Sequence, residues 1–278
     1  MNTANPQSQN LISMACQLRR DVINSLSVAG SGHLGASLGL ADIFSVLYFS
    51  VLNHCPEEPT WPYRDRLVLS IGHVAPVYYA AMANAGYFSR EELLTLRQLG
   101  SRLQGHPSRQ AALPGVESAS GSLGQGLSIA VGMALTAKLD KQDWHVYSVH
   151  GDGELQEGAI WEAAMSAAHY NLHNLTAIVD RNGVQIDGPT RTVMGLEPLS
   201  EKFEAFGWHV LTCDGNSIDA LLNAFHKVSE VDDKPTVIIA NTRMGAGVPQ
   251  IENDYTWHGK APDEQQREAF LRALDNEN

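Results

Sequence analysis

The chain has 278 residues, of which 44% are hydrophobic and 18% are charged. This composition is typical of a globular protein and excludes a disordered or fibrous chain. Its 19 Lys and Arg residues against 31 Asp and Glu residues give a net charge of -12, which disfavours binding to nucleic acid or to an anionic membrane. An anionic cofactor would therefore need a local binding device.

No stretch of the sequence is typical of membrane insertion or secretion. The longest apolar stretch, Leu38 to Leu52, contains Asp42 and is shorter than the roughly 20 residues of a membrane span. The polar first ten residues lack the pattern of a signal peptide, so we expect a cytoplasmic protein with a flexible segment at residues 1–10. Three cysteines without metal-binding spacing are expected to be reduced, packed thiols: Cys16, Cys55 and Cys213.

The first half of the chain is predicted to be mainly helical. Apolar residues recur at helical spacing from Leu11 to Leu26 and stop before Gly30, and a loop is expected at 31–39. Ser89 and Glu92 have the spacing of a capping box. The predicted helices cover residues 11–26, 41–52, 89–99 and 121–139.

Short β-rich runs alternate with helical segments in the second half. An apolar run at 66–70 is a first candidate strand, and four more lie at 145–149, 175–180, 208–213 and 235–240. This alternation predicts an α/β fold, a mostly parallel sheet with helices on both faces. No linker or repeat is evident, so we expect one three-layer domain over residues 11–278.

Two polar loops follow consecutive predicted strands. Asp152 lies in GDGELQEG (151–158) and Asn182 in RNGVQIDG (181–188). Ligands of open parallel sheets bind at the carboxyl ends of the strands, so these two side chains are expected to lie together if their strands are neighbours. A carboxylate, an amide oxygen and a backbone carbonyl are ligands suited to Mg²⁺. The spacing therefore predicts a magnesium site.

The same loops could also hold phosphate groups. Gly151, Gly153 and Gly183 would let the backbone approach phosphates closely, and a helix beginning near Glu154 would direct N–H groups at them. Singly, such glycine turns are most often ordinary turns. Their joint occurrence at two successive strand ends favours the binding site, whereas GSLGQG (121–126) does not match the dinucleotide fingerprint and the 180–188 loop does not match a Ca²⁺-binding EF-hand loop.

Four of the eleven histidines lie beside glycine or in a glycine-containing loop: His33, His73, His106 and His258. A single histidine is more often structural than functional, but four in such loops indicate an assembled polar site. Neutral imidazoles can bind hydroxyls, and protonated ones can stabilise an oxyanion or a diphosphate.

In order and spacing, these motifs resemble the thiamine-diphosphate-binding amino-terminal half of transketolases over roughly Leu11 to Asp263. The motifs that carry the resemblance are SGHLGASLG, SIGH, QGHPS, residues 117–128, GDGELQEG with its NG partner loop, QIDG, FGW and WHG. The resemblance implies that Asp152, Asn182 and the main-chain carbonyl of Val184 hold Mg²⁺, or Ca²⁺ or Mn²⁺ in its place.

The resemblance also assigns roles to the other motif residues. It implies that Gly153, His73 and His258 contact the diphosphate, and that the backbone of Gly121, Ser122 and Leu123 contacts the aminopyrimidine. It places His33, His106 and His258 along the substrate channel. Glu157 is expected to reach towards an activating glutamate of a partner chain.

The chain resembles one of the two chains of a split transketolase, which transfers a two-carbon ketol unit from a ketose to an aldose. It contains no match to the pyrimidine-binding and carboxy-terminal domains, so the resemblance implies a partner chain, an α2β2 heterotetramer, and sugar or sugar-phosphate substrates. Pro107-Ser108 and Ile71 depart from the family pattern near the substrate side. Two alternatives are a subunit of another thiamine-diphosphate enzyme, either a 1-deoxyxylulose-type synthase or a 2-oxo-acid decarboxylase or dehydrogenase, and a degenerate nucleotide-binding module.

Overall fold

A computed structural model describes residues 6–276 of the chain. Its centre is a five-stranded, fully parallel sheet with the strand order β1-β2-β3-β7-β6, which confirms the predicted fold class. The strands are β1 Arg66–Leu69, β2 Val146–Gly151, β3 Leu175–Arg181, β6 His209–Asp214 and β7 Thr236–Asn241. All five fall on the predicted β-rich runs, with bounds that differ by one or two residues.

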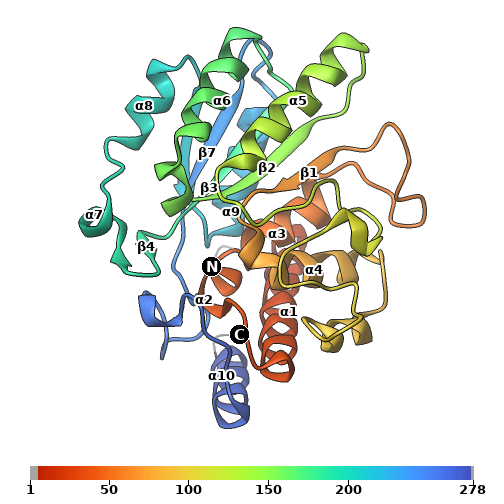
Figure 1. Ribbon diagram of the computed structural model, residues 1–278, viewed down its shortest axis with the longest axis vertical. Helices are drawn as coiled ribbons and strands as arrows, with labels where there is room; N and C mark the ends of the chain where they lie inside the picture. Colours follow the sequence, from red (N-terminus) through yellow and green to blue (C-terminus); the bar gives the residue numbers. More distant parts are fainter. Residues whose placement is uncertain (1–5, 277–278) are drawn as a thin grey trace.

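Helices cover both faces of the sheet (Figure 1). One apolar core packs α1 Pro6–Ala29, α2 Leu34–Gly39, α3 Ala41–Val46, α4 Ala75–Ala85, α9 Ile218–Val228 and α10 Glu264–Asn276 with residues such as Leu69 and Ile238. The other packs α5 Gln125–Leu139, α6 Gly158–His169 and α8 Leu199–Ala205 against alternate strand residues such as Val68 and Val237. This alternation explains why the strand sequences are apolar on both faces.

Several shorter elements complete the described chain. They are the π-helical turn η1 Leu47–Val51, the 3-10 turns η2 Gly72–Val74, η3 Arg90–Thr95, η4 Arg109–Ala111, η5 Gly153–Gln156 and η6 Tyr255–Trp257, the hairpin β4 Val184–Gln185 with β5 Gly188–Pro189, and α7 Thr190–Val193. Within residues 6–276, no helix is long and apolar enough to cross a membrane.

The first helix begins earlier than predicted. It starts at Pro6, and the buried Ser8 hydroxyl donates a hydrogen bond of 2.6 Å to Asp219 on α9, so residues 6–10 are the first turns of α1. Proline is favoured in a first helical turn because its missing N–H would have no intrahelical partner there. The rest of the predicted flexible segment, residues 1–5, lies outside the described residues.

Three other helix predictions were wrong in detail. The expected capping box does not form, because Glu92 pairs with Arg102 at 2.7 Å and the segment becomes the short turn η3. The predicted helix over 41–52 is divided into α3 and η1. The predicted helix over 121–139 begins only at Gln125, after a left-handed Gly124.

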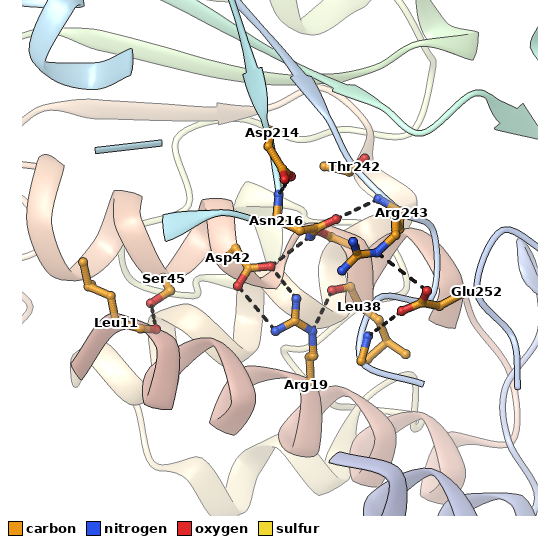
Figure 2. A network of polar contacts seen from close by, with 12 residues as sticks. Leu11, Arg19, Leu38, Asp42, Ser45, Asp214, Asn216, Thr242, Arg243 and Glu252 are labelled. Carbon is orange, nitrogen blue, oxygen red and sulfur yellow. Dashed lines mark hydrogen bonds and ion pairs between the residues drawn. The ribbon is translucent and has the colours of Figure 1, made fainter. Parts of the chain in front are cut away.

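The expected loop at 31–39 contains the fully buried helix α2. A buried polar network holds its carboxyl end (Figure 2): Arg19 donates to the Leu38 carbonyl at 3.2 Å, and Asn216 donates to the Gly39 carbonyl at 2.9 Å. Both side chains also contact the Asp42 carboxylate. Helix carbonyls at a carboxyl end need such partners when buried, so tertiary contacts stabilise a helix whose two glycines disfavour it.

Candidate active site

The carboxyl ends of β2 and β3 bring together the two predicted metal ligands. Gly151 pairs in register with Asp180, so Asp152 and Asn182 follow at the same edge of the sheet, as predicted. The buried Asp152 carboxylate accepts hydrogen bonds from the Gly153 N–H at 2.7 Å and the Gly183 N–H at 2.6 Å. These bonds fix its orientation and leave lone pairs on both oxygens.

A buried carboxylate missed by the sequence analysis orients Asn182. The Asn182 amide donates to Asp180 Oδ2 at 2.8 Å, while its oxygen accepts from the Val184 N–H at 3.0 Å. The other Asp180 oxygen accepts from the Thr242 hydroxyl. The signal was available, because Asp180 precedes Asn182 by two residues at the end of the same strand.

A cavity of about 290 Å³ lies over these strand ends. The predicted site residues that line it are His73, Leu123, Gly151, Asp152, Gly153, Glu154, Glu157, Asn182, Val184 and His258. Ile71, which was expected near the substrate side, also lines it, together with residues to which the prediction gave no role: Ala36, Gln156, Asp180, Gln185, Ile186 and Asp187. The Gln156 amide donates to Gln185 at 2.7 Å, which links the two strand-end loops.

Three of the four predicted histidines form a cluster beside this cavity: His73 and His258 line it, and His33 packs against both rings. The ring centroids lie 4.9 Å apart for His33 and His73, 5.2 Å for His73 and His258, and 5.7 Å for His33 and His258. Nδ1 of His33 and Nδ1 of His258 are buried without a hydrogen-bond partner among the described residues. Buried polar atoms of this kind indicate a missing partner, such as a ligand.

His106 makes no ring contact with the three-histidine cluster, although its charge contributes to lowering the pKa of His33 and of His73. Its side chain is exposed and lines a separate cavity of about 390 Å³. Its ring lies 3.9 Å from the point that a Cβ atom on Gly121 would occupy, so it is adjacent to the 121–124 loop.

Residues of the 121–124 loop line two different depressions. Leu123 lines the central cavity, whereas Gly121 and Ser122 line a neighbouring one of about 490 Å³ together with Ser120, whose buried hydroxyl has no partner among the described residues. The Gly124 N–H donates to Glu154 Oε1 at 2.8 Å, which ties this loop to the end of β2.

The carboxylate of Glu154 makes its hydrogen bonds within the protein. It accepts from the Ser70 hydroxyl and the Gly124 N–H, and it pairs with His150 at 3.1 Å. Burial alone would raise its pKa, but these contacts outweigh it and lower the pKa. A cofactor contact by Glu154 would therefore use its backbone. The helix expected near Glu154 begins only at Gly158, because the short turn η5 intervenes.

Glu157 lies at the edge of the cavity. Its side chain is exposed, and its Cβ lies 2.7 Å from the point that a Cβ atom on Gly124 would occupy. Only glycine fits at 124 beside it, since the backbone there is also left-handed, with φ of 82°.

Comparison with known proteins shows the family to which the chain belongs. Residues 8–275 match the family model described as transketolase, thiamine diphosphate binding domain. The chain belongs to this transketolase family. The structure also superposes on a transketolase from Campylobacter jejuni with a TM-score of 0.91 and 35% identity, covering 99% of this chain and 43% of that one.

Two kinds of relative match this transketolase domain. Transketolase-like protein 2 of Homo sapiens is 41% identical over 97% of this chain, which spans only 43% of that protein. An apulose-4-phosphate transketolase subunit from Actinobacillus succinogenes is 41% identical over 100% of both chains. The 6-deoxy-6-sulfo-D-fructose transketolase subunit SqwG of a Clostridium species is 40% identical over 98% of both.

The residues of the transketolase domain fit thiamine diphosphate and a divalent cation. The Asp152 carboxylate is 2% exposed and forms no ion pair with a Lys, Arg or His of the described chain, so burial raises its pKa to about 6. Burial, together with the charge of Asp152, raises the pKa of Asp180 to about 7. A bound cation would relieve this cost. Residues 6–276 contain no cluster of three His, Cys, Asp or Glu side chains that could hold a metal, so the remaining ligands would be amide, carbonyl and phosphate oxygens.

The histidine cluster is neutral at pH 7. Burial, with a smaller effect from neighbouring histidines, lowers the pKa of His33 to about 4 and that of His73 to about 3. Burial also lowers the pKa of His258. Neutral imidazoles can both donate and accept hydrogen bonds, which suits contact with sugar hydroxyls.

These lowered pKa values predict that the histidine cluster makes the folded chain less stable in acid. Between pH 6.5 and the lowered pKa of His73, the unfolded chain binds more protons than the folded chain, so lowering the pH through this window favours unfolding. The raised pKa values of Asp152 and Asp180 have the opposite effect on the pH dependence of stability. The quantity to compare is therefore the difference in unfolding free energy between the His73 variant and the wild type at each pH. Replacing His73 with Gln should gain about 2 kcal/mol of relative stability between pH 7 and pH 5.

Urea unfolding of both chains at each pH checks this prediction. His226→Gln is the control, because this exposed side chain on α9 is solvated in both states. Equal pH dependence for the His73 variant and the wild type would show that His73 is not desolvated in the folded chain.

Proposed function

We propose that this chain is the thiamine-diphosphate-binding subunit of a two-chain transketolase that transfers a two-carbon ketol unit between sugars. The observation that carries the proposal is the Asp152–Asn182 pair at the ends of neighbouring strands, beside three neutral histidines. Relatives of the same length, named as subunits of transketolases, support the two-chain form. Their names include a 4-phosphate and a 6-sulfo sugar, which supports a substrate with an anionic end.

The proposed cofactor site uses both strand-end loops. Asp152, Asn182 and the Val184 carbonyl would hold Mg²⁺, and backbone N–H groups at Gly153 with His73 and His258 would bind the diphosphate. When bound, thiamine diphosphate supplies the carbanion chemistry that breaks and forms the carbon–carbon bond. The 121–123 backbone would contact the aminopyrimidine.

The histidines would bind and orient the sugars. His33 and His258 each have a buried ring nitrogen without a partner among the described residues. Each nitrogen can therefore donate a hydrogen bond to a sugar hydroxyl, or accept one from it, without losing a contact in the protein. His106, which lies beside Gly121, would contact the sugar from the side of the 121–124 loop. As neutral imidazoles they can also move protons to and from a sugar oxygen.

A second chain would complete the site. Glu157 is exposed at the cavity edge, and Leu123, Ile186 and Met194 are large apolar side chains that are 37%, 66% and 60% exposed. Burial of this face in an obligate contact above roughly 2,000 Å² fits a stable α2β2 assembly. The three thiols, all within residues 6–276, form no disulfide, which supports a reducing compartment such as the cytoplasm.

Reconstitution tests the proposal. The purified chain is mixed with a second chain that carries the pyrimidine-binding and carboxy-terminal domains, with thiamine diphosphate and Mg²⁺ present. We expect no ketol transfer from this chain alone and activity at the mass of a heterotetramer. Full activity without a partner would refute the two-chain form.

The same assay separates the alternatives. Decarboxylation of pyruvate without ketol transfer would indicate a 2-oxo-acid enzyme, and condensation of pyruvate with an aldose would indicate a 1-deoxyxylulose-type synthase. Absence of cofactor binding by the mixture would indicate a degenerate module.

A further inference from the structure

The first turn of α5 has no capping side chain of its own. The helix begins at Gln125, and the residue before it, Gly124, has no side chain. Two side chains from other segments accept the free N–H groups instead. Glu154 Oε1 accepts from the Gly124 N–H at 2.8 Å, and the Ser70 hydroxyl accepts from the Gly126 N–H at 3.1 Å. Because the first N–H groups of a helix lack intrahelical partners, these two side chains fix the start of α5.

The Glu154 carboxylate joins this helix start to the ends of β1 and β2. Its side chain is fully buried. In addition to the Gly124 N–H, Oε1 accepts from the hydroxyl of Ser70, which follows β1. Oε2 contacts His150 Nδ1 at 3.1 Å and the Gly151 N–H at 3.4 Å, both on β2. One buried carboxylate therefore connects three segments that are separate in the sequence.

Close backbone packing holds the same segment against the strand ends. A Cβ atom on Gly126 would lie 2.7 Å from the Cα atom of Ser70. A Cβ atom on Gly72 would lie 3.0 Å from the carbonyl carbon of Ser120. Backbone atoms cannot move aside as the end of a flexible side chain can, so the 120–126 segment has little room to shift.

The segments that Glu154 connects belong to different parts of the proposed cofactor site. Asp152 and Gly153, which precede Glu154, line the cavity over the strand ends, and Leu123 lines the same cavity from the other segment. In the proposed function, Asp152 and Gly153 bind the metal and the diphosphate, whereas the backbone at Leu123 contacts the aminopyrimidine. Glu154 therefore lies between the two halves of this site.

We propose that Glu154 is a positioning residue that sets the separation between the diphosphate half and the aminopyrimidine half of the cofactor site. This inference rests on the proposed function and gives the Glu154 side chain a role that needs no contact with the cofactor. A ligand that bridges two loops binds tightly when the protein already holds both loops at the right separation. Hydrogen bonds from backbone N–H groups to a buried carboxylate are charge-assisted and can hold the loops in this way.

The experiment compares a ligand that reaches both loops with one that reaches only the first. Calorimetry measures the binding of thiamine diphosphate and of inorganic pyrophosphate to the two-chain assembly, with Mg²⁺ present. We expect Glu154→Leu to weaken thiamine diphosphate binding about 10- to 100-fold and to leave pyrophosphate binding within about twofold of the wild type. Glu154→Gln should recover much of the loss, since its amide oxygen can still accept from the Gly124 N–H.

A second variant tests the same contacts if Glu154→Leu does not fold. Ser70→Ala removes the hydroxyl that lies between Glu154 and the Gly126 N–H, so it should weaken thiamine diphosphate selectively, by less than Glu154→Leu does. Ser45→Ala is the matched control, because this buried serine of α3 donates at 2.8 Å to the Leu11 carbonyl and does not line the cavity. We expect it to change neither affinity.

Hydrogen exchange of the chain without cofactor gives a readout that is independent of ligand binding. The Gly124 N–H should exchange about 10- to 100-fold faster in Glu154→Leu than in the wild type, while the amides of β7 keep their rates. Unchanged exchange of Gly124, or equal weakening of both ligands, would overturn the positioning role alone. Absence of thiamine diphosphate binding by the wild-type assembly would overturn the proposed function and this role together.

Discussion

Replacing Asp152 with alanine is expected to abolish Mg²⁺-dependent retention of thiamine diphosphate and to reduce ketol transfer by more than about 100-fold. Loss of an outer-shell partner of a metal ligand costs about 10- to 100-fold, and Asp152 would be the only charged ligand, so the effect should exceed that range. The measurements are cofactor titration by calorimetry and activity of the reconstituted enzyme.

The stability of the Asp152 variant separates a binding effect from a folding effect. In chelator and without cofactor, its unfolding temperature should stay within about 3 °C of the wild type, because the variant no longer buries a carboxylate whose raised pKa reports a desolvation cost. Asp143→Ala is the control, since this exposed residue precedes the other end of β2. Normal cofactor affinity in the Asp152 variant would show that the metal assignment is wrong.

Replacing Asp42 with alanine is expected to cost about 3–5 kcal/mol in the free energy of unfolding. The Arg19 and Asp42 side chains are 11% and 9% exposed, so removing the carboxylate leaves a buried guanidinium without its counter-charge. The Asn216 amide also loses one of its two acceptors. Because this network holds the carboxyl end of α2 (Figure 2), the loss should also loosen the segment that carries His33.

Urea unfolding of the chain measures the effect of the Asp42 substitution. The double variant Arg19→Met with Asp42→Leu should regain much of the stability, because apolar side chains of similar size can replace a buried ion pair. Asp275→Ala, which removes the exposed partner of Arg20, should cost less than about 1 kcal/mol. A loss for Asp42→Ala as small as that of the control would show that the buried pair contributes little.

The sequence by itself determined the strands and the placement of Asp152 and Asn182, the two proposed metal ligands, at their ends. The β-rich runs are short and bounded by turns, and the side chains of β2, β3 and β7 are buried on both faces, so the local composition indicates the parallel sheet directly. Asp152 and Asn182 follow such runs immediately. Once β2 and β3 are neighbours, their positions at one edge follow from the register of a parallel pair.

Only the tertiary structure decided α2 and the histidine cluster. Two glycines in six residues favour a loop, but the segment is fully buried and contacts Arg19, Asn216 and the 243–245 turn, which are distant in sequence. His33, His73 and His258 meet because α2 is fixed in this way. The carboxylate of Glu154 turns inward for a similar reason, since Ser70 and Gly124 offer hydrogen bonds that only folding brings near. Long-range packing and the satisfaction of buried polar groups therefore set those parts of the site that local pattern does not encode.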